Sequence, residues 1–332
     1  MRSILKSLCV STAVLSLYAC ADNSDENAEP QMKISMVTTH AFDTDMQVQS
    51  LSYVPNNVAP WLGRVILMGT DGKIFSTDIE GRSPIAIDTN TYRDTLGLSR
   101  DNAPGVFLAV TEDNKLVSFV ESDDDGSFTP ITVTAPLLAP LVFCQSTEPA
   151  KNSLKLLMTA NKIVSLSVEV KDDLVEILSQ DSQSIPKNTI ACVFSGDTLT
   201  VLIQNAKSQS AVKTLIDGKW KTIANTNNSI HINAIDFAED SYIAISGNGH
   251  QSLQKMTPHT SAPNTSLSYT INDGLSIQGM DKTDYVHATS ANFGGAAFSD
   301  GVIAMIDSAK NRIVFISRIY ASEKINEVDT RK

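Results

Sequence analysis

The chain has 332 residues, a formal net charge of −11 and 42% hydrophobic residues. This length can bury a large core, and the composition is that of a folded protein. Its 26 basic residues are scattered and outnumbered by 37 acidic ones, which argues against nucleic acid as a partner because a phosphate backbone requires clustered Lys and Arg. Beyond the N-terminus, no apolar run approaches the roughly 20 residues of a membrane-spanning helix.

The N-terminus has the pattern of an export signal. A basic start (Arg2 and Lys6) precedes a short apolar run at 8–17, as in a signal peptide that is later removed. The run ends in LYAC at 17–20, which resembles the lipobox of bacterial lipoproteins. That resemblance implies that residues 1–19 are a lipoprotein signal peptide and that Cys20 is acylated. Acyl chains would then hold the protein at a membrane.

The residues after the cleavage site bear on localisation. Ala21, not Asp, follows the anchoring cysteine, and by resemblance to Gram-negative lipoproteins this implies the outer membrane, with the protein facing the periplasm or the exterior. Residues 20–32 are polar and acidic and contain almost no large apolar group. They cannot bury enough surface to fold, so we expect an acidic flexible tether.

Two cysteines, Cys144 and Cys192, remain in the predicted mature body beyond the anchor. An exported compartment permits a disulfide between them. Cysteines on apolar strands are, however, commonly buried thiols. The sequence leaves both states open and favours the thiols.

A strand pattern repeats through most of the chain. An apolar strand, a turn of Gly, Asp or Asn and a second alternating strand follow one another in six cores, whose starts lie roughly 40 to 60 residues apart. These cores begin at Gly63, Gly105, Ser153, Asp197, Asp240 and Asp300. The spacing predicts an all-β fold, a six-bladed β-propeller over residues 33–322 with about four antiparallel strands per blade. Residues 323–332 are expected to form a C-terminal tail.

The segment KISMVTT at 33–39 precedes the first complete blade. We expect it to close the ring by pairing with strands of the last blade, because closure removes exposed sheet edges. A pair of β-sandwich domains is the structural alternative. It is less favoured because no composition break or linker separates two halves of the chain.

Several short motifs occur in the order found in a known family. They include GTD at 69–71, DIEG at 78–81, IACV at 190–193 and FSDG at 298–301. Together they resemble the β-propeller phytases over residues 43–319. The resemblance implies a six-bladed propeller, and in that family it is associated with calcium-dependent hydrolysis of inositol phosphates.

The positions that the family uses for calcium and phosphate are mostly changed in this chain. Gln47 and Val48 replace paired aspartates, Ile190 replaces a glutamate, and the lysine expected after GTD is shifted by one residue. Calcium prefers six to eight oxygen ligands, so these changes predict a protein without catalytic residues. The residues left for a residual metal or phosphate site are Asp45, Asp71, Lys73, Arg93 and Asp94.

Three functions remain open at this stage. The preferred one is a phytase-like propeller lipoprotein of the cell envelope that is not catalytic and binds an unknown ligand or envelope protein, without a cofactor. The alternative is a divergent calcium-dependent phytase with a site rebuilt from Asp71, Lys73, Arg93 and Asp94. A third is an envelope scaffold with no small-molecule site.

Overall fold

Antiparallel β-strands form most of the folded body in the computed structural model. The structure describes residues 32–329 except 83, 102–104, 123–125, 137, 160, 172–173, 206–208, 228–230, 248–249 and 257–265. The predicted signal peptide, Cys20 and all but the last residue of the predicted tether lie outside the described residues. The strands belong to five sheets.

Two sheets come first along the chain. The first contains β3 (Val48–Val54), β4 (Arg64–Gly69), β5 (Ile74–Asp78) and β6 (Ile85–Ala86), with the short helix η1 (Pro60–Leu62) between β3 and β4. The second has eight strands, which are β7 (Tyr92–Leu98), β8 (Val106–Thr111), β9 (Leu116–Glu121), β10 (Phe128–Thr134), β11 (Pro140–Phe143), β13 (Ser153–Met158), β14 (Lys162–Lys171) and β15 (Leu174–Ser184).

Three further sheets complete the body. One contains β12 (Gln145–Ser146), β16 (Thr189–Ser195), β17 (Thr198–Gln204), β18 (Gln209–Ile216) and β19 (Lys219–Asn227). The next contains β20 (His231–Asp236), β21 (Ser241–Gly247), β22 (His250–Met256), β23 (Ser266–Asn272) and β1 (Met32–Val37). The last contains β24 (Tyr285–Thr289), β25 (Val302–Asp307), β26 (Arg312–Ser317) and β2 (His40–Asp43), with helix α1 (Gly295–Phe298) between β24 and β25.

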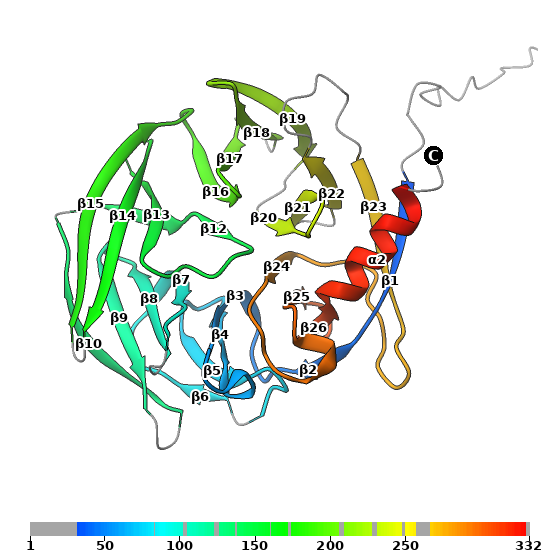
Figure 1. Ribbon diagram of the computed structural model, residues 1–332, viewed down its shortest axis with the longest axis horizontal. Coiled ribbons are helices and arrows are strands. Elements are labelled where there is room, and N and C mark those ends of the chain that lie inside the picture. The colour runs from blue at the N-terminus through cyan, green and yellow to red at the C-terminus, as the bar shows by residue number, and fades with distance from the viewer. Residues whose placement is uncertain are drawn as a thin grey trace, which may run out of the picture. The chain divides into compact units, whose positions relative to one another are not determined.

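The sheets are arranged around a common centre, with an edge strand of each sheet innermost (Figure 1). Neighbouring innermost strands contact one another in the cyclic order β3, β7, β11, β16, β20 and β24, and β24 contacts β3 again. β12 lies near the centre beside β16 and β20 (Figure 1). This all-β arrangement is that of a β-propeller, as the strand repeat predicts.

Innermost strands approach one another very closely. A Cβ atom on Gly97 of β7 would lie 1.7 Å from the backbone oxygen of Tyr53 on β3, which no side chain permits. Between strands, the turns use residues that accept left-handed backbone, such as Asn161 (φ 54°) and Asn311 (φ 48°), because Asn and Gly tolerate this region. Gly97 therefore allows β7 to pack against β3, while asparagine residues form the hairpin turns.

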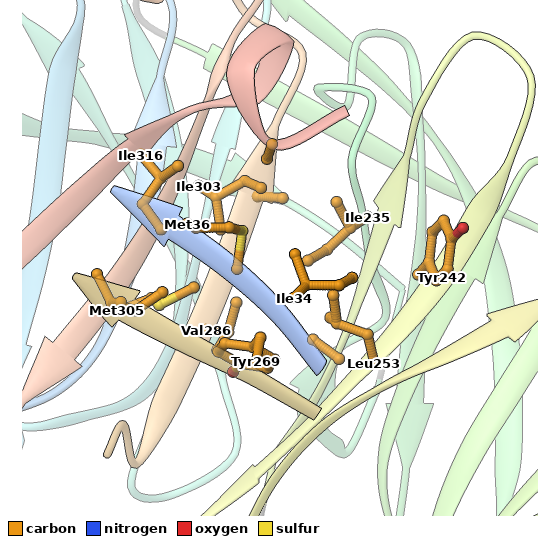
Figure 2. Packing of buried hydrophobic residues seen from close by; sticks show 14 of the residues in the cluster. Ile34, Met36, Ile235, Tyr242, Leu253, Tyr269, Val286, Ile303, Met305 and Ile316 are labelled. Carbon is orange, nitrogen blue, oxygen red and sulfur yellow. The ribbon is translucent and has the colours of Figure 1, made fainter. Parts of the chain in front are cut away.

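The N-terminal segment joins the last two sheets. The sequence predicts that residues 33–39 pair with the last blade, but β1 pairs in parallel with β23 of the preceding sheet, and the following strand β2 pairs with β26 of the last one. Ile34 and Met36 point from β1 into a core cluster shared by both sheets (Figure 2). Alternation of the apolar residues along β1 decides which face of the strand is buried.

The last described residues form a helix where the sequence predicts a tail. Helix α2 (Arg318–Asp329) begins directly after β26 and contacts β1. Ala321 and Ile325 lie four residues apart, on one side of the helix, and both are buried in the same core cluster as Ile34 and Met36. Ala321 and Ile325 are the two deeply buried residues of this helix. Two apolar positions are too few to indicate an amphipathic helix in the sequence. The described part of the chain contains no helix that is long and apolar enough to cross a bilayer.

Cys144 and Cys192 form a disulfide, with Cα atoms 4.6 Å apart. Cys144 lies between β11 and β12, and Cys192 lies on β16, so the bond joins the eight-stranded sheet to the sheet that follows it. Both cysteines are buried. Of the two states that the sequence left open, the structure contains the disulfide.

Candidate functional site

A cavity of about 160 Å³ opens where the innermost strands begin. We call it the mouth cavity. Its lining includes residues from the start of β3, β7, β16, β20 and β24 and from the end of β11, so strands from all five sheets converge on it. The polar residues in this lining are Gln49, Ser50, Arg93, Asp94, Gln145, His231 and Tyr285.

Asp94 supplies the acidic group of the mouth cavity. One carboxylate oxygen accepts a hydrogen bond from the Thr95 N–H at 2.9 Å, and the other accepts one from the Phe143 N–H at 2.7 Å. Burial raises the pKa of Asp94 to about 7, although these two hydrogen bonds act in the opposite direction. The carboxyl group therefore changes its charge near neutral pH.

Arg93, the neighbouring cation, is directed elsewhere. Its Nε donates to Glu112 at 3.0 Å and its Nη1 donates to Asn114 at 2.9 Å. The side chain is 37% exposed. Glu112 pairs with the Arg93 guanidinium, and the Asp94 carboxyl has no cationic partner among the described residues.

Two neighbouring groups on β20 and β24 are uncharged. Burial lowers the pKa of His231 to about 4, against the opposing effect of the Asp284 charge. The imidazole packs edge-on against the Tyr285 ring, with centroids 4.9 Å apart. The Tyr285 hydroxyl donates to the Leu51 carbonyl at 3.2 Å, and burial raises the pKa of this phenol. Neutral polar groups thus face the cavity beside Asp94.

Buried polar side chains link the innermost strands. The Ser52 and Thr95 hydroxyls lie 2.8 Å apart, and Asn233 donates to Gln145 at 3.4 Å. His287 Nδ1 lies 2.7 Å from the Leu51 carbonyl, and burial lowers the pKa of this imidazole to about 4. These contacts connect β3 with β7 and β24, and β12 with β20, so the centre of the ring is held by hydrogen bonds between neighbouring sheets.

The five residues predicted for a residual metal or phosphate site are not brought together. Arg93 and Asp94 line the mouth cavity, whereas Asp45 is exposed between β2 and β3. Asp71 and Lys73 are exposed in the turn between β4 and β5, with Lys73 Nζ 3.7 Å from Asp71 Oδ2. Asp71 also accepts the Lys73 N–H at 3.2 Å, the local bond typical of a turn aspartate.

Carboxylates do not form a metal-binding group in the described part of the chain. Across those residues, no three His, Cys, Asp or Glu side chains lie close enough to hold a metal ion. A larger depression of about 850 Å³ borders the β23–β24 connection and contains Asp273, Asp281 and Asp307. Its Asp307 is already paired with Arg312 at 2.9 Å. The mouth cavity is therefore the better candidate, since the described residues include no ionic partner for its carboxyl group.

Sequence reasoning missed His231, Tyr285 and Gln145 as cavity residues. In the sequence, none of the three belongs to a motif that marks a binding or catalytic residue. His231 and Tyr285 are the first residues of the innermost strands β20 and β24, and Gln145 is the first residue of β12 beside them. That shared position in the repeat is the signal that could have identified them.

Comparisons with known proteins leave the family open. No protein-family model matches the chain, and no curated protein matches it by sequence. The N-terminal domain of Nup159 is 10% identical, with 76% of this chain and 73% of that chain covered and a TM-score of 0.40. The SapL1 lectin in complex with alpha methyl fucoside is 14% identical, with coverage of 78% and 89% and a TM-score of 0.43.

A third solved structure is the Myceliophteria thermophila Cps50 (Swd1) beta-propeller domain. It is 10% identical, with 81% of this chain and 83% of that chain covered and a TM-score of 0.44. Similarity at this level carries no argument about what the present chain binds. The assignment of its fold rests on its own cycle of innermost strands.

Proposed function

We propose that this chain is a lipid-anchored, six-bladed β-propeller of the bacterial cell envelope that binds a ligand or partner at its mouth cavity and catalyses no reaction. The observation that carries the proposal is the mouth cavity, where β3, β7, β12, β20 and β24 place polar side chains beside the Asp94 carboxyl group, which has no ionic partner among the described residues. The loops and strand ends of a β-propeller can vary in sequence while its sheets stay the same.

Division of the eight-stranded sheet supports the count of six blades. Strands β7 to β10 form one antiparallel set, and β11, β13, β14 and β15 form a second. The two sets are joined by a short parallel pairing of β10 with β15. Counting them separately gives six sets, each with one strand in the inner cycle.

The order of the short motifs along the chain supports a common ancestry with the phytases. The separation of the acidic side chains supports a loss of phytase activity. Asp45 and Asp71 lie on exposed turns, and Asp94 is the one acid among the described residues that line the mouth cavity. We expect purified protein to release no phosphate from inositol hexakisphosphate, with or without Ca²⁺, because hydrolysis needs fixed cations around the developing charge. Phosphate release that requires Ca²⁺ and stops on addition of EDTA would favour the divergent phytase instead.

The lipid anchor is supported by LYAC at 17–20 and by the polar segment that follows it. Cys20→Ser removes the thiol that is acylated, so we expect the variant protein in the soluble fraction of the envelope and the wild type in the outer membrane fraction. Metabolic labelling with a fatty acid gives an independent measurement. Unchanged membrane association and unchanged labelling of the variant would rule out this anchor.

A further inference from the structure

The mouth cavity combines an unpaired acid with apolar walls, and this combination narrows the class of ligand. We propose that it binds the ammonium end of a primary alkylamine, supplied by a lysine side chain of a partner or by a free diamine, with the Asp94 carboxylate as counter-ion. This inference rests on the proposed binding function. It adds the chemistry of the ligand.

Charge is the first argument. Among the described residues of the cavity lining, Arg93 and Asp94 carry a formal charge at neutral pH. Arg93 is held by Glu112 and Asn114, so it does not neutralise Asp94. Each Asp94 oxygen accepts one backbone hydrogen bond and retains further acceptor capacity. An ammonium group, with three donors, complements this acid, whereas a phosphate would be repelled by it.

Shape and wall chemistry are the second argument. Met68, Val142, Ile190, Ala191 and Ile232 line the same cavity and suit the methylene groups of an alkyl chain. Its volume of about 160 Å³ is close to the roughly 150 Å³ cavity that holds benzene. The cavity therefore accepts one side chain or a short diamine.

The other titratable groups near Asp94 do not oppose a cation. His231 on β20 is neutral because burial lowers its pKa to about 4, and burial of Tyr285 on β24 raises the pKa of its phenol, which keeps it protonated. On β7, Arg93 is paired with Glu112. Ser50 on β3 adds a buried hydroxyl that has no hydrogen-bond partner among the described residues and can therefore bond a ligand.

Binding of an ammonium group depends on pH in a defined direction. Only the ionised Asp94 attracts the ligand, and the pKa of this carboxyl group is about 7 in the protein. Affinity therefore rises with pH, by up to about tenfold per unit below pH 7, and levels off above it until the amine loses its own proton near pH ~10.

The test is isothermal titration calorimetry of the whole protein with each ligand at pH 6 and at pH 8. The probes are 1,5-diaminopentane and Nα-acetyl-lysine N-methylamide, with 1-pentanol and Nα-acetyl-norleucine N-methylamide as neutral controls. We expect at least one amine to bind, several-fold more tightly at pH 8, and the neutral controls to bind at least tenfold more weakly. Binding by the lysine amide points to a protein partner, and binding by the diamine alone points to a free amine.

Two variants complete the test. Asp94→Asn should weaken binding of the amine at least tenfold and remove its pH dependence, while Asp71→Asn, on an exposed turn, should change neither. Three results would overturn the inference. They are equal affinity for amines and neutral controls, no binding of any amine, and unchanged amine affinity in a folded Asp94→Asn protein. In Ala191→Trp the larger side chain fills the cavity. A ligand of another class that binds the wild type and does not bind this variant would overturn the amine assignment. The proposed binding function would remain intact.

Discussion

Arg312→Ala is expected to lower the free energy of unfolding by about 3–5 kcal/mol, because it leaves a buried carboxylate unpaired. Arg312 Nε donates to Asp307 at 2.9 Å, and both side chains are only 7% exposed. Its two terminal nitrogens donate to the carbonyl oxygens of Gln278 and Gly279. The substitution therefore deprives three buried or partly buried acceptors of their donor.

The loss of Arg312 should also weaken the closure of the ring, because of its position in the last sheet. Arg312 is the first residue of β26 and pairs with Asp43, the last residue of β2. Urea unfolding followed by circular dichroism measures the loss of stability. Arg82→Ala is the matched control, since the Arg82 side chain is 70% exposed and its ion pairs with Asp78 and Glu80 should contribute less than about 1 kcal/mol. Similar losses in the two variants would contradict the role assigned to the buried pair.

The second large effect is expected from the disulfide. Replacing both Cys144 and Cys192 by Ser should lower the free energy of unfolding by about 4 kcal/mol, the chain-entropy estimate for a loop of this length, since the two residues are 48 positions apart. The bond also joins neighbouring sheets beside the mouth cavity, which Cys192 helps to line. Its loss should therefore loosen the site as well as the fold.

Unfolding with and without a reducing agent measures this contribution. Reduction should destabilise the wild type by about the same amount as the double substitution, and it should leave the double variant unchanged. Thiol labelling of the denatured, unreduced wild type should detect neither Cys144 nor Cys192. Labelling of both residues would show that they are the buried thiols that the sequence favoured.

Local sequence signals predict the strands well and their long-range partners poorly. Alternating apolar residues and turns at residues such as Asn161 and Asn311 indicate hairpins directly. The partner of β1 depends on which sheet leaves an edge open, and this is decided by the closed ring rather than by the strand itself. Helix α2 was missed for a related reason, because Ala321 and Ile325 become core residues only when β1 is beside them.

The candidate site was predicted in part. Resemblance to the phytases identified Arg93 and Asp94, which the structure places in the mouth cavity, and also Asp45, Asp71 and Lys73, which lie on exposed turns. A motif in the sequence does not say which face of a strand or turn a side chain occupies. His231 and Tyr285 carry no motif at all, and only the convergence of the innermost strands brings them to Asp94.

Binding at the mouth cavity is tested most directly by the thermal unfolding midpoint of three proteins across one panel of amines, amino acids, sugars and inositol phosphates. The proteins are the wild type, Ala191→Trp, which fills the cavity, and Ala86→Trp, an equal change at an exposed position on β6. A ligand that binds only the folded protein raises its midpoint. We predict that at least one compound raises the midpoints of the wild type and Ala86→Trp and leaves that of Ala191→Trp unchanged. Equal responses of all three proteins to every compound would contradict a binding site at the mouth of the ring.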